Sequence, residues 1–445
     1  MRLHIGFDDT DSPRGGCTTY IAALLVEHLS HIGVTFLDYP NLIRLNPNAP
    51  WKTRGNGALC LRIEVEDALL DEVVEVVNRT VEEHSELDYE GTDPGVVFLS
   101  GQVPEELKRF AKRTIQGIVA LKEAVKLAER FCVDFKYFKK GRGIIGGLAA
   151  VGEELKGDHT FEVIAYRTPQ NRGTPRRVDE ASILEMDSLT KPLTFNNIDP
   201  ETGRILITPR GPDPILWGIR GETAEIVRKA QSIAKALEKI ERWVIFRTNH
   251  GTDAHLRRVN SISEVKPFNP VIVRGTVKDP PHIIPRRHVI FSIEDGTGSV
   301  DCAAYAPTGA LRKAVALLVP GDLVEVYGGV RPPSNAVPLT INLEKLRIVH
   351  LKPLIEQINP LCPVCGSRTE SMGRGKGLRC KKCGYRSKNL KKVNRLLERP
   401  LKEALYVTSP RSQRHLTKPL SRYGREKNNV EEPMIKEWHS PLNLT

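Results

Sequence analysis

Residues 3–20 read LHIGFDDTDSPRGGCTTY, and this stretch places a buried strand, an acidic loop and the start of a helix in succession. Leu3 to Phe7 is apolar enough for a strand, and the loop after it is polar and contains glycine. Apolar residues then return at helical spacing over Tyr20–Leu29. Strand, loop and helix in this order predict that the chain opens with an α/β or α+β domain.

Three carboxylates gather in that loop, at Asp8, Asp9 and Asp11. Carboxylates this close cannot all stay ionised unless a cation lies between them. Mg²⁺ with nucleotide phosphates is the natural cation, because it takes hard oxygen ligands and completes its shell with phosphate and water. An acidic or hydroxyl residue before a helix is also ordinary capping chemistry. The local pattern therefore leaves a magnesium site and a helix cap both open.

Two glycine-bearing segments are candidates for phosphate binding. Gly15, Gly16 and Thr19 lie where the first helix begins, and backbone N–H groups and hydroxyls there can meet a phosphate. The later segment 139–147, KKGRGIIGG, is flexible and cationic; its alternative is a loop that packs a helix through its last two glycines. The candidates in this second segment are Lys140, Gly141, Arg142 and Gly143.

A third segment, residues 47–57 with the sequence PNAPWKTRGNG, combines an indole with two cations. Trp51 and Arg54 suit a nucleobase and an RNA phosphate, and Lys52 suits a nucleotide phosphate. The alternative is that Trp51 covers the edge of a core.

The middle of the chain reads as a second α+β module. A strand at 161–167, two helices between 179 and 237 and a strand at 242–246 suit a small ferredoxin-like unit. We expect a polar linker over 249–260.

Two smaller modules are predicted downstream. Five short strands between 271 and 349, with a helical stretch at 309–318 after the third, have the order of an OB-fold barrel, whose usual ligand is single-stranded or looped nucleic acid. Two CxxC motifs follow, and two thiolate pairs at this separation can close a structural tetrahedral zinc site. The four ligands are Cys362, Cys365, Cys380 and Cys383.

Cations surround the zinc motif and continue into the C-terminal segment. Lys381 and Lys382 favour phosphate binding there, with a solvated charged face as the alternative. Beyond Lys427 we expect disorder. In the segment between the zinc motif and Lys427 the apolar residues recur at helical intervals, which predicts that part of this segment packs. These residues are Val393, Leu396, Leu397, Leu401 and Leu405.

Composition limits the class of protein. A chain of 445 residues is too long for one core and should hold several domains. The net charge of +12 favours a polyanionic partner such as nucleic acid. No apolar run reaches the ~20 residues needed to cross a bilayer, so no membrane partner is expected. The first residues carry no signal-peptide pattern, which predicts a cytoplasmic protein.

Several of these motifs together resemble the archaeal tRNA 2-agmatinylcytidine synthetases. The resemblance rests on GFDDTDSPRGGCTTY, RLNPNAPWKTRGNG, GTDPG, GRGIIGGLAA, the OB-like stretch and the two CxxC pairs, and it extends from Met1 to about Gly424. It implies an α+β multidomain protein with a kinase-like α/β catalytic domain at 1–138 and a ferredoxin-like, agmatine-binding domain at 139–258. An OB-fold at 265–350, a zinc ribbon at 358–390 and a basic tail at 391–445 would follow.

The resemblance also implies a reaction. The family uses ATP to attach agmatine to the wobble cytidine of the isoleucine tRNA with a CAU anticodon, which then reads AUA instead of AUG. ATP phosphorylates the cytosine carbonyl oxygen, and the primary amine of agmatine displaces phosphate at the same carbon. The family's phosphorylated threonine falls on Thr18, beside Asp8, Asp9 and Asp11 as catalytic residues, with Mg²⁺ on Asp8 and Asp11.

Agmatine is a dication, so its guanidinium needs a carboxylate. The candidates are Asp158, Glu162 and Asp213, and Asp199 and Glu222 are two further candidates in the same module. Two other functions stay open: a non-enzymatic nucleic-acid-binding protein that relies on the OB-fold and zinc ribbon, and another ATP-dependent ligase that acts on a small amine.

Overall fold

The acidic loop joins β1 to α1 at the centre of the first module, in a computed structural model that describes residues 1–430 and 432–440. The strands of this module lie in the order β6-β5-β1-β4-β3, with β1 antiparallel to both of its neighbours. The strands are β1 (Arg2–Asp8), β2 (Thr35–Phe36), β3 (Asn41–Arg44), β4 (Gly57–Glu64), β5 (Gly95–Ser100) and β6 (Asp134–Tyr137).

Helices cover both faces of this sheet, because its strands are apolar on both sides. In β4, Leu59, Leu61 and Ile63 belong to the core with α1 and α2, whereas Ala58 and Cys60 belong to the core with α3, α4 and α5. The helices are α1 (Thr18–Ile32), α2 (Leu70–His84), α3 (Glu105–Gln116), α4 (Leu121–Phe131) and α5 (Gly143–Gly152).

The second module has the ferredoxin-like order β10-β7-β9-β8, as predicted. A parallel contact between β10 and β3, Arg247 with Asn41 and Thr248 with Leu42, joins the two modules into one ten-stranded sheet. The elements are β7 (Thr160–Arg167), α6 (Glu180–Thr190), β8 (Thr194–Phe195), β9 (Ile215–Gly221), α7 (Ala224–Ile233) and β10 (Ile240–Thr248).

The predicted linker at 249–260 is partly buried instead. Asn249 and His250 are 2% and 0% exposed, because they fill the joint between β10 and β3. Asn249 donates from Nδ2 to the carbonyl oxygen of Arg44 at 3.0 Å, which ties the start of this segment to the first module.

The third module is the predicted OB-fold barrel. Its strands pair in the order β12-β16-β17-β15-β14, and pairing of β14 with β12 closes it. The helix α8 (Ala310–Val315) lies between the third and fourth barrel strands. The strands are β12 (Pro270–Val277), β14 (His288–Asp295), β15 (Gly298–Ala304), β16 (Leu323–Arg331) and β17 (Thr340–His350), with β11 (Arg257–Arg258) and β13 (His282–Ile284) added at its margins.

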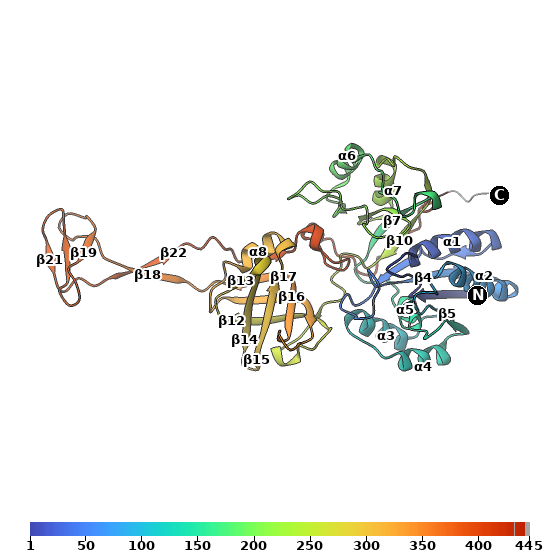
Figure 1. Ribbon diagram of the computed structural model, residues 1–445, viewed down its shortest axis with the longest axis horizontal. Helices are drawn as coiled ribbons and strands as arrows, with labels where there is room; N and C mark the ends of the chain where they lie inside the picture. Colours follow the sequence, from blue (N-terminus) through green and yellow to red (C-terminus); the bar gives the residue numbers. More distant parts are fainter. Residues whose placement is uncertain (431, 441–445) are drawn as a thin grey trace.

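The zinc ribbon lies at the far end of the molecule, on a two-stranded stalk (Figure 1). The helical spacing predicted for residues 393–405 is wrong: β22 (Val393–Leu397) pairs antiparallel with β18 (Leu354–Ile358). The chain must return from the ribbon to the barrel, and pairing the outgoing and returning strands satisfies their backbone groups. The remaining strands are β19 (Thr369–Ser371), β20 (Leu378–Cys380), β21 (Arg386–Ser387) and, on the barrel, β23 (Leu405–Val407).

The disorder predicted beyond Lys427 is also wrong for the part of that segment that the structure describes. Trp438 is only 8% exposed and belongs to the core of the first two modules. Its carbonyl oxygen accepts a hydrogen bond from the N–H of Ile245 at 2.8 Å. Because β3 is short, part of the β10 edge is free to take this segment.

No helix among the described residues is long and apolar enough to span a membrane.

Candidate active site

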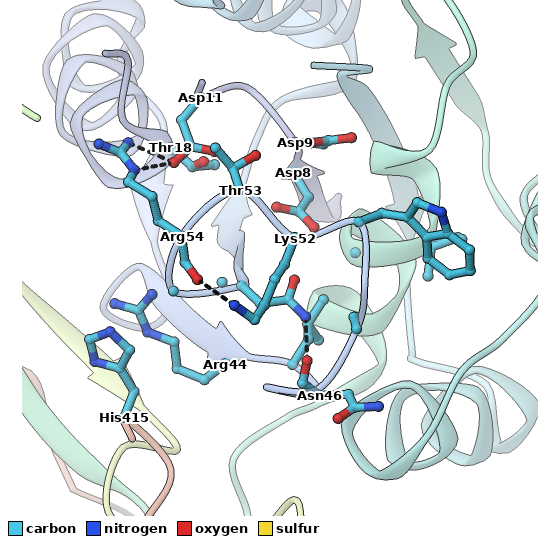
Figure 2. Close-up of a pocket in the computed structure, with 18 of the residues that line it drawn as sticks. Asp8, Asp9, Asp11, Thr18, Arg44, Asn46, Lys52, Thr53, Arg54 and His415 are labelled. Atoms are coloured by element: carbon cyan, nitrogen blue, oxygen red, sulfur yellow. Dashed lines mark hydrogen bonds and ion pairs between the residues drawn. The ribbon is translucent and has the colours of Figure 1, made fainter. Parts of the chain in front are cut away.

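A pocket of about 350 Å³ opens at the end of β1, where the first two modules meet. Asp8, Asp9 and Asp11 line it from the acidic loop, and Thr18 lines it from the first turn of α1 (Figure 2). Residues 44–57, 114–119 and 209–215 complete most of its wall. The structure therefore brings the predicted catalytic residues together in one cavity.

Asp8 reaches the pocket because a glycine lies against it. A Cβ atom on Gly146 would lie 1.9 Å from Asp8 Oδ2, so only glycine lets α5 approach this carboxylate. Burial first, and then the charge of Asp9, raises the pKa of Asp8 to about 8. Among the described residues no Lys, Arg or His lies within ion-pair distance of Asp8. Asp8 thus has no counter-ion among the described residues, and its raised pKa favours the protonated form until a cation binds.

Asp9 and Asp11 each have an arginine. Arg142 Nη2 lies 3.0 Å from Asp9 Oδ2, and Arg54 Nη2 lies 2.6 Å from Asp11 Oδ2. Burial raises the pKa of Asp9 to about 6, against the opposing effect of Arg142. Helix capping does not explain these aspartates, because the N-cap of α1 is Cys17 and no side chain caps that helix end.

Thr18 occupies the first position of α1 and is 8% exposed. Thr10 Oγ1 donates a hydrogen bond to Thr18 Oγ1 at 3.0 Å, which orients the hydroxyl. The N-terminus of a helix carries positive potential and free N–H groups, so this position favours a phosphate. Thr19 also lines the pocket and lies 3.0 Å from the thiol of Cys17.

Not every predicted phosphate residue lines this pocket. Gly15 pairs with Ser12 in a β-bridge, and Gly16 (φ 73°) accepts a hydrogen bond from Arg54 through its carbonyl oxygen. Both glycines thus support the conformation of the loop and do not line the pocket. Gly143 packs against the backbone of Asp8, where a Cβ atom would lie 2.4 Å from the Asp8 carbonyl oxygen.

A second hollow, of about 520 Å³, lies on the other side of the acidic loop. Lys140 and Asp93 line it, and Arg142 lines both hollows. Gly141 (φ 69°) turns the chain between these two cations. Sequence reasoning missed Asp93 as a site residue, although it lies in the GTDPG motif that supported the family resemblance.

The segment 47–57 supplies cations and an exposed aromatic ring to the main pocket. Trp51 is 58% exposed, so it does not cover a core edge. Lys52 Nζ donates to the carbonyl oxygen of Arg54 at 3.3 Å, and both side chains line the cavity. Arg54 also lies 3.5 Å from Asp213 Oδ2.

Of the five candidate carboxylates for agmatine, only Asp213 lines the pocket. Its side chain is 9% exposed, and Arg176 Nη2 donates to Asp213 Oδ1 at 3.2 Å. The other four are ion-paired outside the pocket, Asp158 and Glu222 with Arg422, Glu162 with Arg220, and Asp199 with Arg411.

Sequence reasoning missed Arg44 and His415, which also line the main pocket. Arg44 ends β3 and precedes the segment with Trp51, so its position next to that motif was a usable signal. His415 comes from the C-terminal segment, and no local pattern indicates that it lies beside Arg44.

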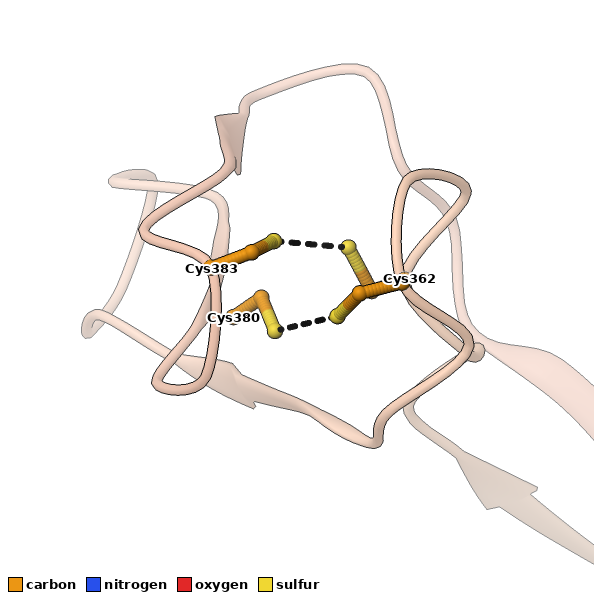
Figure 3. A group of neighbouring side chains, drawn as sticks. Cys362, Cys380 and Cys383 are labelled. Atoms are coloured by element: carbon orange, nitrogen blue, oxygen red, sulfur yellow. Dashed lines mark hydrogen bonds between the residues drawn. The ribbon is translucent and has the colours of Figure 1, made fainter.

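The four motif cysteines form the predicted metal site. Their Sγ atoms all lie within 4.8 Å of one another, with Cys362 to Cys383 at 3.6 Å and Cys365 to Cys380 at 3.4 Å (Figure 3). A tetrahedron of Zn–S bonds near 2.3 Å places sulfur atoms about 3.8 Å apart, so the cluster fits Zn²⁺.

The zinc ribbon lies at the opposite end of the molecule from the first module, which carries the acidic loop (Figure 1). Lys381 pairs with Glu370 at 2.7 Å, and Lys382 is exposed. Any contact that they make with a ligand is therefore remote from the acidic loop.

Comparison with known proteins identifies four domain families along the chain. Residues 4–68 match the TiaS TCKD domain, 141–255 the TiaS FLD domain, 271–349 an OB-fold nucleic acid binding domain, and 359–401 the TiaS C-terminal zinc ribbon domain. The order of these families agrees with the order of modules in the fold.

Full-length relatives are also similar. The isoleucine-tRNA 2-agmatinylcytidine synthetase TiaS of Archaeoglobus fulgidus is 43% identical over 430 residues, which cover 97% of this chain and 100% of the relative. The enzyme of the same name from Pyrococcus horikoshii is 44% identical over 420 residues, covering 94% and 97%.

Solved structures agree. A crystal structure of TiaS in complex with its isoleucine tRNA and ATP has a TM-score of 0.83 at 43% identity, over 95% of this chain and 97% of that one. A complex of TiaS with the same tRNA, AMPCPP and agmatine has a TM-score of 0.81 at 40% identity, over 98% and 99%.

Proposed function

This chain belongs to the TiaS family of isoleucine-tRNA 2-agmatinylcytidine synthetases, and from that premise we propose how its pocket performs the reaction. The protein is an ATP-dependent ligase that joins agmatine to a cytidine of an isoleucine tRNA. One observation carries the assignment of residues: the acidic loop, Thr18, Arg142 and Asp213 all face one cavity at the joint of two modules.

The reaction needs an activated oxygen. A cytosine carbonyl is a poor electrophile, because oxide is a poor leaving group. Transfer of a phosphoryl group from ATP to that oxygen makes it a good one. The amine of agmatine then forms the new C–N bond, and the C–O bond breaks with the oxygen leaving on phosphate. The modified tRNA would then read AUA.

Asp8 and Asp11 would hold Mg²⁺, which when bound neutralises charge on the phosphate oxygens. The fit is supported by the Asp8 carboxylate, which faces the pocket without a cationic partner among the described residues. Asp9 holds Arg142 in the wall shared by the two hollows, so that this guanidinium can meet a phosphate oxygen.

Thr18 would take part in phosphoryl transfer from the N-terminus of α1. Its hydroxyl accepts from Thr10, which leaves its own proton directed elsewhere, and the helix end stabilises negative charge that develops nearby. Thr19 and Lys52 line the main pocket and Lys140 lines the second hollow, and these three would contact the other phosphate groups. Gly15, Gly16, Gly141 and Gly143 would act indirectly, by giving the acidic loop and the turn before α5 the conformation that the site needs.

Asp213 is the carboxylate that we assign to the agmatine guanidinium. It is the only one of the five candidates that lines the pocket, and its contacts with Arg176 and Arg54 support a carboxylate that can bind guanidinium groups. Asp158 and Glu162 are weaker candidates, because neither lines the pocket and each is ion-paired outside it.

Trp51 and Arg54 would receive the wobble cytidine. An enzyme that modifies the ring must draw the base out of the anticodon loop, and an exposed indole at the pocket rim can stack on it. Lys381 and Lys382 would contact tRNA at a distant point, through the zinc ribbon.

Mass spectrometry of nucleosides tests the function. We expect unmodified isoleucine tRNA with a CAU anticodon, incubated with the protein, ATP and agmatine, to yield a cytidine heavier by one agmatine less one water. ATP cleavage that is indifferent to tRNA would indicate a small-amine ligase instead. Binding of tRNA without any cleavage would indicate a non-enzymatic binding protein.

A further inference from the structure

A third cavity, of about 480 Å³, shares a wall with the active-site pocket. Its lining comes from the segment after β3 and from the C-terminal segment around Arg414 and His415. Of the described residues that line it, none is an aspartate or glutamate. The lining includes Arg44, Lys52, Arg54, Arg414 and His415.

The buried carboxylate of Glu162 orients Arg44 and His415 indirectly, because His250 and Arg220 lie between it and them. His250 Nδ1 lies 3.0 Å from Glu162, and His250 Nε2 accepts a hydrogen bond from Arg44 Nε at 2.5 Å. Glu162 also accepts from Arg220 Nε at 3.1 Å, and Arg220 Nη2 donates to His415 Nδ1 at 3.2 Å. The proton of neutral His415 is therefore on Nε2. A Cβ atom on Gly55 would lie 3.0 Å from that nitrogen, at the cavity wall.

The positive groups outnumber their counter-charges. Among the described residues neither Arg44 nor Lys52 lies within ion-pair distance of a carboxylate. Arg414 donates to Asn48 Oδ1 at 2.5 Å and lies 3.7 Å from Glu344. Burying charge without a partner is costly, so such a cluster is usually completed by an anion.

The pKa directions agree with an incompletely neutralised cluster. Burial, with a smaller contribution from Arg220 and against Glu162, lowers the pKa of Arg44 to about 10. Burial, followed by Arg44 and Arg220, lowers the pKa of His415 well below its ordinary value.

We propose that this cavity is a second anion site, in which Arg44, Arg414 and His415 hold a phosphate group beside the active-site pocket. Guanidinium groups and an N–H donor at one cavity are the donors that phosphate oxygens take. Two sources have this chemistry: a phosphodiester of the RNA backbone next to the base in the pocket, or free phosphate released from the reaction. Glu162, His250 and Arg220 are positioning residues for this site.

Arg414→Gln tests the site on the full-length protein. The matched control is Lys402→Gln, which removes one charge from an exposed lysine in the same C-terminal region. Calorimetric titration with inorganic phosphate, without tRNA or ATP, measures the site directly. Filter binding of tRNA over a salt series measures backbone contacts. We expect Arg414→Gln to weaken phosphate binding roughly tenfold and Arg414→Lys to recover part of it.

The two sources are separated by the tRNA measurement. If an RNA phosphodiester occupies the site, Arg414→Gln also lowers the log–log salt slope of tRNA binding by about 0.7 to 0.9. If released phosphate occupies it, tRNA binding is unchanged. If Arg414→Gln binds both phosphate and tRNA as Lys402→Gln does, the proposal is wrong. Should Arg414→Gln melt early, His415→Gln carries the same test.

The RNA source rests on the proposed function, whereas the phosphate titration does not. A wild-type protein that makes no modified nucleoside contradicts the proposed function, whatever the variants do. A wild-type protein that makes it, with Arg414→Gln binding phosphate and tRNA normally, contradicts only the second anion site.

Discussion

Gly146 allows the Asp8 carboxyl group of the acidic loop to keep its position in the pocket. The position lies inside a helix, where alanine would ordinarily be more stable than glycine by ~0.5–1 kcal/mol. Here an added Cβ atom would overlap Asp8 Oδ2, so the carboxylate must move.

We expect Gly146→Ala to cost about 1–3 kcal/mol of stability, as overpacking does, and to remove most ATP cleavage because Asp8 is displaced. The control is Gly157→Ala, at a position where a Cβ atom would meet nothing within 4 Å. Thermal melts and phosphate release measure the two effects. Full activity in Gly146→Ala would show that the position of Asp8 is not critical.

Asp8 itself gives a second prediction. Asp8→Asn keeps the shape of the side chain but removes the carboxylate that we assign to Mg²⁺. We expect ATP cleavage to fall roughly 100-fold or more. tRNA binding should persist, because the zinc ribbon, whose cations we assign to tRNA, lies at the opposite end of the molecule from the first module (Figure 1). Asp71→Asn, at an exposed position of α2, is the control. Equal activity in both variants would contradict a catalytic role for Asp8.

At the scale of elements, periodicity predicts local structure well and long-range packing poorly. The buried strand before Asp8, the helix after Thr18 and the order of the five barrel strands follow from local spacing of apolar residues. The spacing at 393–405 misleads, because a short run of apolar residues fits a strand as well as a helix and the partner β18 lies far back in the chain.

The same limit applies to the site. Local motifs predicted Asp8, Thr18, Cys362 and its partner cysteines. They did not indicate that Arg422 forms ion pairs with Asp158 and Glu222, because the partners are 264 and 200 residues apart in the sequence.

The zinc ribbon is an element whose removal should separate binding from chemistry. We expect Cys380→Ser to release about one zinc per chain, because three thiolates hold the ion less tightly than four. tRNA affinity should then fall, while amine-independent ATP cleavage by the first module should largely survive. Cys132→Ser, at a single cysteine outside the cluster, is the control. Metal analysis that finds no zinc in the wild-type protein would contradict the assignment.

At the scale of the whole molecule, the C-terminal segment ties three modules together. Arg411 pairs with Asp199 of the ferredoxin-like module, Thr417 donates to Glu344 of the barrel, and Arg414 donates to Asn48 of the first module. Several cations of this segment are therefore ion-paired within the protein, which reduces the number available to RNA.

Glu344 makes this coupling dependent on pH. Burial alone would raise its pKa, but His255 at 3.0 Å, and then Arg414 and Thr417, outweigh burial and lower the pKa from 4.5 to about 2. Because the folded pKa lies below the unfolded value, the stabilisation is complete above about pH 4.5 and is lost as the pH falls toward 2.

We therefore expect Glu344→Gln to destabilise the protein by up to about 3 kcal/mol near neutral pH. The difference from wild type should shrink as the pH falls through 4.5. Thermal melts of both proteins between pH 7 and pH 3 measure it, with Glu356→Gln on the exposed stalk as the control. A difference that stays constant with pH would contradict the lowered pKa.

Trp438 tests whether the last described part of the chain holds the two catalytic modules together. Its ring packs edge-on against Phe36, with the ring centroids 5.4 Å apart, and its carbonyl oxygen accepts from Ile245 on β10. The β3–β10 contact that joins the modules extends over only two residue pairs. The packing of this indole therefore adds to a short contact between the two modules.

We expect Trp438→Ala to cost about 3–5 kcal/mol of stability, as loss of a buried aromatic ring does. The active-site pocket lies at the same joint, so ATP cleavage should be lost at a lower temperature than in wild type. The salt slope of tRNA binding should not change, because no cation is removed. Calorimetry and a salt series measure these effects, with Glu437→Ala, whose side chain is 73% exposed, as the control. A changed slope with normal stability would instead place this segment in the RNA-binding surface.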